Sequence, residues 1–452
     1  MSTFKPTDLK RRVLRAGSWS IAGYGAAQVI RLASNLVMAR LLAPEMFGIM
    51  AIALTAMMVM SMISDIGLSH SIVQNPRGDD PAFLDTAWTV QVVRGFLLWF
   101  AALGLSAMLL LFGTGGSGPG GSVYHSEVLP AVVAVSAFAA VISGFQSTKM
   151  ASALRRFDQR RLVQMELISY AAGLVVMIGI GVATRSIWAL VIGGLVSNLS
   201  TAVLSHAWLP GHRNRWRCER KAFKELLGFG KWLFLSSTMS ILALQGDRLL
   251  LGAFVDAQTL GLYAIAALIL GALEGALARL LTAVALPALS EIARNDPSRL
   301  REVYYQLRLP GDIGLLFIAG FLFATGQLVI DVLYDPRYSA AGGMLRILAL
   351  SLIALRYAHA YQIYIAVGKP SYLAFINVAR CAALFISVPV LNHFYGIEAA
   401  IWGIALHGLA MLPFVYGFNA KLGINDLRRE LIVLPVLPVG YACGALLNLL
   451  QG

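Results

Sequence analysis

Charged residues are scarce in this chain, and acidic residues are scarcer than basic ones. Only 23 of its 452 residues are Asp or Glu, and all charged residues together make up 13%, against 58% hydrophobic residues. A soluble domain of this length needs a far more polar surface, so the composition excludes one. Apolar runs of about 20 residues recur along the whole sequence, which is the pattern of a polytopic helical membrane protein.

Cysteine is also rare, and Cys218, Cys381 and Cys443 stand far apart in the sequence. This spacing contains no CxxC motif and no disulfide framework. The seven histidines do not cluster, and the adjacent acids Asp79 and Asp80 lie in a turn between two prolines. We therefore expect no metal site, no cofactor and no enzymatic activity.

Lys and Arg gather in alternate connectors between the hydrophobic runs. One set of connectors holds 25 of them, and the opposite set holds only Arg185 and Arg337. This asymmetry places the N-terminus in the cytoplasm under the positive-inside rule. It also explains the net charge of +13 without a nucleic-acid partner, because basic connectors face an anionic bilayer surface. The expected spans are residues 17–42, 46–74, 86–112, 127–148, 162–184, 187–209, 228–254, 260–290, 309–333, 342–367, 372–394, 397–419 and 431–450.

A short repeat indicates two lobes. The segments 47–53 (FGIMAIA) and 260–266 (LGLYAIA) lie 213 residues apart and share four residues in register. We predict an all-α protein in which two lobes of six transmembrane helices surround a central cavity. Its parts are a basic tail at 1–16, an N-lobe at 17–209, a basic connector at 210–227, a C-lobe at 228–419 and a C-terminal hydrophobic segment at 420–452. Pro435 and Pro438 interrupt the last segment, which either spans the membrane once or forms a re-entrant pair.

Ionisable residues inside the expected spans mark the candidate site. Nine basic residues lie there against four deep acids, so pairing between them cannot neutralise every cation. A surplus of arginine at bilayer depth requires a wet cavity, and arginine suits a phosphate ligand. The cations that indicate this cavity are Arg31, Arg94, Arg279, Arg356 and Arg380; polar residues on the same helix faces are Tyr24, Gln28 and Asn35 beside Arg31, and Gln91 beside Arg94. The acids Asp65, Glu166, Asp247 and Glu274 either pair with arginines or bind a coupling proton or sodium ion.

Several short motifs, taken in order, resemble the polysaccharide transporter (Wzx-type oligosaccharide flippase) family. They are residues 40–48 (RLLAPEMFG), 65–69 (DIGLS), 247–252 (DRLLLG) with 260–263 (LGLY), 333–338 (LYDPRY) and 368–370 (GKP). The resemblance implies membership of the multidrug/oligosaccharidyl-lipid/polysaccharide exporter superfamily, whose members have two six-helix lobes and work by alternating access. It also adds Arg248, which lies in the third motif, to the candidate cavity cations.

The resemblance further implies a cargo and a location. The cargo is an undecaprenyl-pyrophosphate-linked glycan, moved from the cytoplasmic to the periplasmic leaflet of a bacterial inner membrane for O-antigen, capsule or exopolysaccharide. A polysaccharide polymerase and export machinery are the further partners that this role implies.

Three other functions remain open at this point. The first is a cation-coupled multidrug exporter of the same superfamily, for which an acidic, aromatic pocket would be expected. The second is a membrane-embedded glycosyltransferase or ligase, against which the short outer connectors argue. The third is a flippase for a peptidoglycan precursor, which the motifs favour less.

Overall fold

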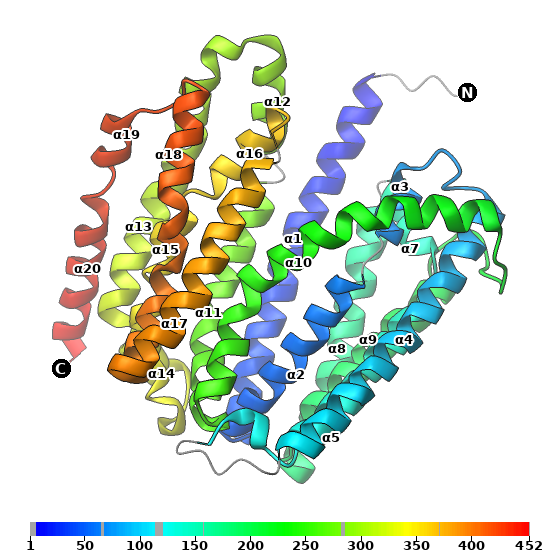
Figure 1. Ribbon diagram of the computed structural model, residues 1–452, viewed down its shortest axis with the longest axis horizontal. Helices are drawn as coiled ribbons and strands as arrows, with labels where there is room; N and C mark the ends of the chain where they lie inside the picture. Colours follow the sequence, from blue (N-terminus) through cyan, green and yellow to red (C-terminus); the bar gives the residue numbers. More distant parts are fainter. Residues whose placement is uncertain are drawn as a thin grey trace. The chain divides into compact units, whose positions relative to one another are not determined.

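The computed structural model describes residues 6–64, 67–113, 121–156, 158–281, 285–369 and 371–451. The side chains of residues 6–17, 20–21, 63, 70, 112–113, 227–240, 243 and 451 lie outside the described set. Within the described residues the regular structure is helical throughout, as the sequence predicts (Figure 1). The expected acid Asp65 lies outside the described residues.

The chain divides into two compact units. The N-terminal unit comprises Met1–Leu42 and Ile49–Ile241, and the C-terminal unit comprises Ala43–Gly48 and Leu242–Gly452. The division between the units therefore falls inside one long helix, α10, while the lobes expected from the sequence begin at residues 17 and 228.

The N-terminal unit contains most of the first ten α-helices. In this unit α8 packs along α9, α1 packs on α8, and α4 contacts α5 and α6. The helices are α1 (Pro6–Leu41), α2 (Pro44–Ile63), α3 (Leu68–Gln74), α4 (Pro81–Gly113), α5 (Leu129–Ser136), α6 (Phe138–Gly144), α7 (Lys149–Arg155), α8 (Gln159–Thr184), α9 (Trp188–Ala207) and the first part of α10 (Arg220–Phe254).

The C-terminal unit contains the first residues of α2, the end of α10 and all the helices that follow α10. Here α13 packs along α20 and against α14, and α12 packs on α16. The helices are α11 (Ala257–Leu280), α12 (Leu286–Asn295), α13 (Leu300–Leu333), α14 (Ala341–Leu348), α15 (Ser351–Leu355), α16 (Ala358–Ala366), α17 (Ser371–Leu406), α18 (Leu412–Lys421), α19 (Leu427–Ile432) and α20 (Val436–Gln451).

Local sequence explains where several helices begin and break. Pro44 and Pro81 start α2 and α4, where a missing backbone N–H costs nothing. Asp256 caps α11 by accepting a hydrogen bond from the backbone N–H of Thr259 at 2.7 Å. Gly396 interrupts α17 with φ of 80°, a conformation that glycine adopts without strain.

Helices of membrane length dominate the chain. Nine stretches among the described residues are long and apolar enough to cross a bilayer, or ten if Leu129–Gly144 and Lys149–Arg155, bent by 63°, form one span. Many large apolar side chains on these helices are exposed, such as Leu111 at 76% and Val175 at 71%, as lipid-facing positions are. The chain is a multi-pass membrane protein.

The C-terminal hydrophobic segment runs beside α13 as one stretch. Leu427–Leu450, which contains α19 and α20, is long and apolar enough for a single span, the first of the two alternatives left open by its prolines. Figure 1 shows α20 alongside α13. Small residues permit this contact, because a Cβ atom at Gly320 would lie 2.1 Å from the carbonyl oxygen of Leu437, and one at Gly440 would lie 2.2 Å from that of Phe317.

Candidate functional site

Arg94 lies on α4 and reaches the end of α2. Its Nε donates a hydrogen bond to the hydroxyl of Ser64 at 3.0 Å, and its Nη2 donates to the carbonyl oxygen of Ser61 at 2.6 Å. Gln91, one helical turn earlier, donates from its amide nitrogen to the carbonyl oxygens of Ser143, Gly144 and Gln146 at 3.0–3.1 Å. These contacts fix both side chains, which the sequence places on one helix face.

Gln91 and Arg94 line the same pocket of the N-terminal unit, which we call the polar pocket. Its volume is about 520 Å³, within the size range of small-molecule sites. Hydroxyl, amide and guanidinium groups face it from α2, α3, α4, α6 and the segment that follows α6. Its polar lining residues are Ser61, Ser69, Gln91, Arg94, Ser143 and Gln146, and Met57, Met58 and Leu98 contribute apolar surface.

Arg31 lies on α1 and contacts α8. Its guanidinium donates a hydrogen bond to the hydroxyl of Tyr170 at 3.2 Å, and its central carbon lies 5.8 Å from the centre of that ring. Glu166, one turn before Tyr170 on α8, is exposed. The polar residues predicted beside Arg31, namely Tyr24, Gln28 and Asn35, are all half-buried on α1. The structure therefore places this group on the surface of the α1–α8 pair.

Four other predicted residues meet in the C-terminal unit. Asp247 on α10 accepts a hydrogen bond from the hydroxyl of Tyr263 on α11. Glu274, further along α11, lies close enough to Arg380, Asp247 and Arg248 for their charges to act on its carboxylate. Arg380, on α17, donates to the hydroxyl of a tyrosine of α16, Tyr361, at 3.2 Å. We call the group of Asp247, Arg248, Tyr263, Glu274, Arg380 and His407 the α10–α17 cluster.

Several polar atoms in the α10–α17 cluster are buried and make no hydrogen bond to a described residue. They are Oδ1 of Asp247, Nε of Arg248, Nε of Arg380 and Nε2 of His407. The other nitrogen of His407, Nδ1, lies 2.6 Å from the carbonyl oxygen of Ile404, which only accepts, so Nδ1 carries a proton. Buried polar atoms require partners, so these atoms are available to water or to a polar ligand.

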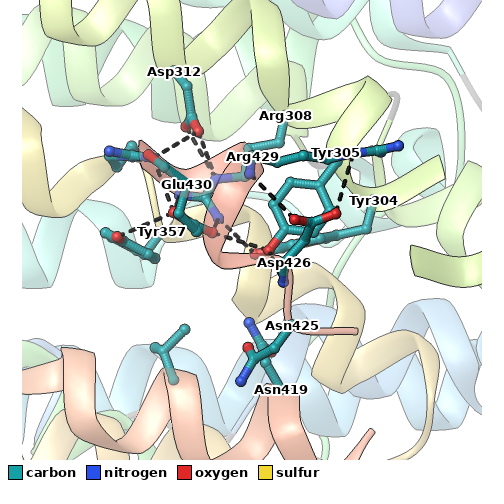
Figure 2. Close-up of polar contacts among 12 residues, drawn as sticks. Tyr304, Tyr305, Arg308, Asp312, Tyr357, Asn419, Asn425, Asp426, Arg429 and Glu430 are labelled. Atoms are coloured by element: carbon teal, nitrogen blue, oxygen red, sulfur yellow. Dashed lines mark hydrogen bonds and ion pairs between the residues drawn. The ribbon is translucent and has the colours of Figure 1, made fainter. Parts of the chain in front are cut away.

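Arg356 is buried in a different cluster, and Figure 2 labels its neighbours Arg308, Asp312, Tyr357 and Glu430. Its guanidinium contacts Glu430 at 2.9 Å and Asp312 at 3.3 Å. Arg308, also fully buried, pairs with Asp312 at 2.8 Å and with both oxygens of Glu430. Tyr357 donates a further hydrogen bond to Glu430 at 3.3 Å. Two arginines and two carboxylates thus balance one another, and this arrangement ties α19 to α13 and to the turn between α15 and α16.

The sequence reading missed Arg308 and Glu430. Both lie just outside the expected spans 309–333 and 431–450, in basic connectors where charged residues need no partner. One signal was available: Arg308 and Asp312 stand four residues apart, the spacing of an ion pair on one helix face. Arg279 is exposed at the end of α11 and is not among the residues that line the polar pocket. Cargo binding stays a prediction for the remaining cations, which are Arg31, Arg248, Arg279, Arg356 and Arg380.

The chain combines long apolar helices with a polar pocket that contains an arginine. This combination is typical of a multi-pass membrane transporter. The profile of the polysaccharide biosynthesis protein family matches residues 37–342, more than half of the sequence. The chain belongs to this family, which confirms the resemblance that the short motifs indicate.

Individual relatives are similar at moderate identity. An uncharacterized membrane protein in the cps region of Klebsiella pneumoniae is 23% identical over 323 residues, 69% of this chain and 64% of that protein. A putative O-antigen transporter of Shigella flexneri is 25% identical over 342 residues, 72% of this chain and 78% of that protein. The amylovoran biosynthesis protein AmsL of Erwinia amylovora is 28% identical over 166 residues, 35% of this chain and 42% of that protein. The matches thus span less than two thirds of the Klebsiella and Erwinia proteins.

Solved structures share the fold. A multidrug resistance MATE family transporter of the MOP superfamily, in an inward-facing conformation, has a TM-score of 0.69 at 13% identity, covering 88% of this chain and 94% of that one. The lipid II flippase MurJ has a TM-score of 0.67 at 12% identity, covering 94% and 97%. This confirms the predicted superfamily fold. The activities that these relatives are named for are transport and flipping, in agreement with the expectation that the chain is not an enzyme.

Proposed function

We propose that this protein flips an undecaprenyl-pyrophosphate-linked oligosaccharide from the cytoplasmic to the periplasmic leaflet during surface polysaccharide synthesis. The family description, the cps-region and amylovoran relatives and the O-antigen transporter relative support this cargo class. The fold shared with a lipid II flippase supports the reaction type. The excess of basic residues in alternate connectors supports an inner-membrane topology with a cytoplasmic N-terminus.

The polar pocket carries the proposal. Its guanidinium suits a pyrophosphate, because planar nitrogen donors match phosphate oxygens, and its amides and hydroxyls suit sugar hydroxyls. A multidrug exporter for organic cations would gain nothing from a cation in this position. The two compact units are the bodies that would move in alternating access.

Arg94→Ala is expected to reduce flipping of a lipid-linked glycan in proteoliposomes by about tenfold or more, because a charge-assisted hydrogen bond to the cargo is lost. Arg94→Lys should recover part of the rate, since lysine keeps the charge but not the planar fork. Arg156→Ala, which removes an exposed cation paired with Asp79, is the control and should flip normally. Normal flipping by Arg94→Ala, at equal protein level, would contradict the site.

We further propose that protons drive the cycle through the α10–α17 cluster. Asp247 and Glu274 there face Arg248, Arg380, Tyr263 and His407. Arginines beside the carboxylates repel a sodium ion, whereas a proton can bind to a carboxylate oxygen or to Nε2 of His407.

Asp247→Asn is expected to abolish the stimulation of flipping by an imposed pH gradient, because an amide cannot exchange the proton. The measurement compares proteoliposomes with and without the gradient, at equal sodium concentration on both sides. Asp331→Asn, at an exposed acid of α13, is the control and should respond like the wild type. A full response by Asp247→Asn, or a response to a sodium gradient alone, would overturn proton coupling at this cluster.

A further inference from the structure

Arg94 and Leu98 line a second pocket besides the polar one. This apolar groove has a volume of about 610 Å³ and lies between α2, α4 and the start of α10 in the N-terminal unit. Most of its lining residues are aliphatic or aromatic, and the wall surface is almost entirely apolar, in contrast to the serines and glutamines of the polar pocket. Its lining residues are Met60, Ser64, Thr89, Val90, Val93, Arg94, Leu97, Leu98, Ala101, Cys218 and Phe223.

The two pockets together complement an amphiphilic molecule that has a charged group between its polar and apolar parts. One side of Arg94 offers hydroxyl and amide groups, and the other offers apolar surface along α4. From Thr89 to Ala101 this wall is about 18 Å long at 1.5 Å per residue. A soluble sugar phosphate would leave the groove empty, and an ordinary lipid tail would leave the polar pocket empty.

We propose that the apolar groove holds the isoprenoid chain of the cargo while Arg94 holds its pyrophosphate and the polar pocket holds its first sugars. This inference rests on the proposed function and adds where each part of the cargo lies. It makes Val93 and Leu97 tail-binding residues, and it assigns the tail to the N-terminal unit instead of the α19–α20 segment.

The end of the groove carries the residues expected where a lipid enters. Trp216, 62% exposed, packs edge-on against Trp88 with ring centres 5.0 Å apart. Arg217 follows it, and its backbone exchanges hydrogen bonds with the hydroxyl of the groove residue Thr89 at 3.0 and 3.2 Å. Tryptophan and arginine favour the membrane–water interface, and arginine attracts lipid phosphates. The groove therefore opens beside an interfacial, cationic rim.

A tryptophan at Val93 provides the first test, because it adds bulk to the groove wall. Val93→Trp is expected to reduce labelling by a photoreactive polyprenyl phosphate without sugars, and flipping of the whole cargo, by about tenfold. Val175→Trp makes the same change at a lipid-facing site of α8 and should leave both unchanged. Wild-type labelling by Val93→Trp would overturn the groove assignment.

Cys218 provides a second test that needs no groove variant, because it lines the groove and is exposed. Polyprenyl pyrophosphate should slow its alkylation by a maleimide, while Cys443 on α20 should react at an unchanged rate. Equal protection by phosphatidylglycerol would show a general lipid groove, and no protection would show that the chain does not enter; either result refutes the proposal. If the wild type flips its cargo but these results fail, the tail site is wrong and the flippase stands. If the wild type flips no lipid-linked glycan, the proposed function itself fails.

Discussion

Replacing Arg308 with alanine is expected to remove most of the folded protein from the membrane. Arg308 is fully buried between the carboxylates of Asp312 and Glu430. Without it, both carboxylates would share Arg356 alone, and one buried negative charge would remain unpaired. Removing one partner of a buried ion pair costs about 3–5 kcal/mol, a large part of the stability of a typical domain. The measurement is the thermal unfolding midpoint in detergent, together with the yield from membranes.

A charge-balanced variant separates electrostatics from packing. Arg308→Met combined with Asp312→Leu removes one charge of each sign and keeps the pair of Arg356 with Glu430 at 2.9 Å. We expect this double variant to regain most of the lost stability, because no buried charge is left without a partner. Arg301→Ala removes a half-exposed ion pair near the same helix and should cost about 0–1 kcal/mol. A double variant as unstable as Arg308→Ala would show that lost packing, not charge imbalance, is responsible.

The cluster of Arg308, Asp312, Arg356 and Glu430 shows which ion-pair partners a local sequence pattern can and cannot identify. Arg356 attracts notice because it stands inside an apolar run, but its partner Glu430 stands in a basic connector 74 residues later. Only the packing of α19 against the helices around α13 buries Glu430, and that packing depends on contacts far apart in the sequence. A count of cations against acids within spans therefore overstates the unpaired charge, because it omits acids brought in from connectors.

The polar pocket was predictable in part for a related reason. Gln91 and Arg94 are three residues apart on one regular helix, so their common face follows from helix geometry alone. The opposite wall comes from Ser143 and Gln146, at the end of α6, where the chain bends by 63° before α7. No apolar periodicity marks such a bend.

The helical fold itself was predictable, because lipid forces the backbone to satisfy its own hydrogen bonds and long apolar runs can do so only as helices.

Alanine at Gly261 is expected to reduce both the stability of the protein and its flipping rate. A Cβ atom at Gly261 would lie 1.8 Å from the carbonyl oxygen of Pro44, and one at Gly48 would lie 2.0 Å from that of Ala257. Backbone oxygens cannot turn aside as a flexible side chain can, so α2 and α11 would have to separate, at a cost of about 1–3 kcal/mol or more. The effect should reach the polar pocket, because the far end of α2 carries Ser61, which accepts from Arg94.

The glycine contact also gives the sequence repeat a physical meaning. Pro44 and Gly48 stand 213 residues before Ala257 and Gly261. Each glycine approaches the carbonyl oxygen of the first residue of the other helix, Ala257 of α11 or Pro44 of α2. If the two contacts form one reciprocal helix crossing, a single separation of the helices relieves both clashes. The losses in unfolding midpoint from Gly48→Ala and Gly261→Ala should then add to clearly more than the loss in the double variant. Gly271→Ala, on the same helix α11 with open space around its Cβ position, should change neither stability nor flipping. Fully additive losses would mean that the two glycines act independently and that the repeat does not reflect a shared contact.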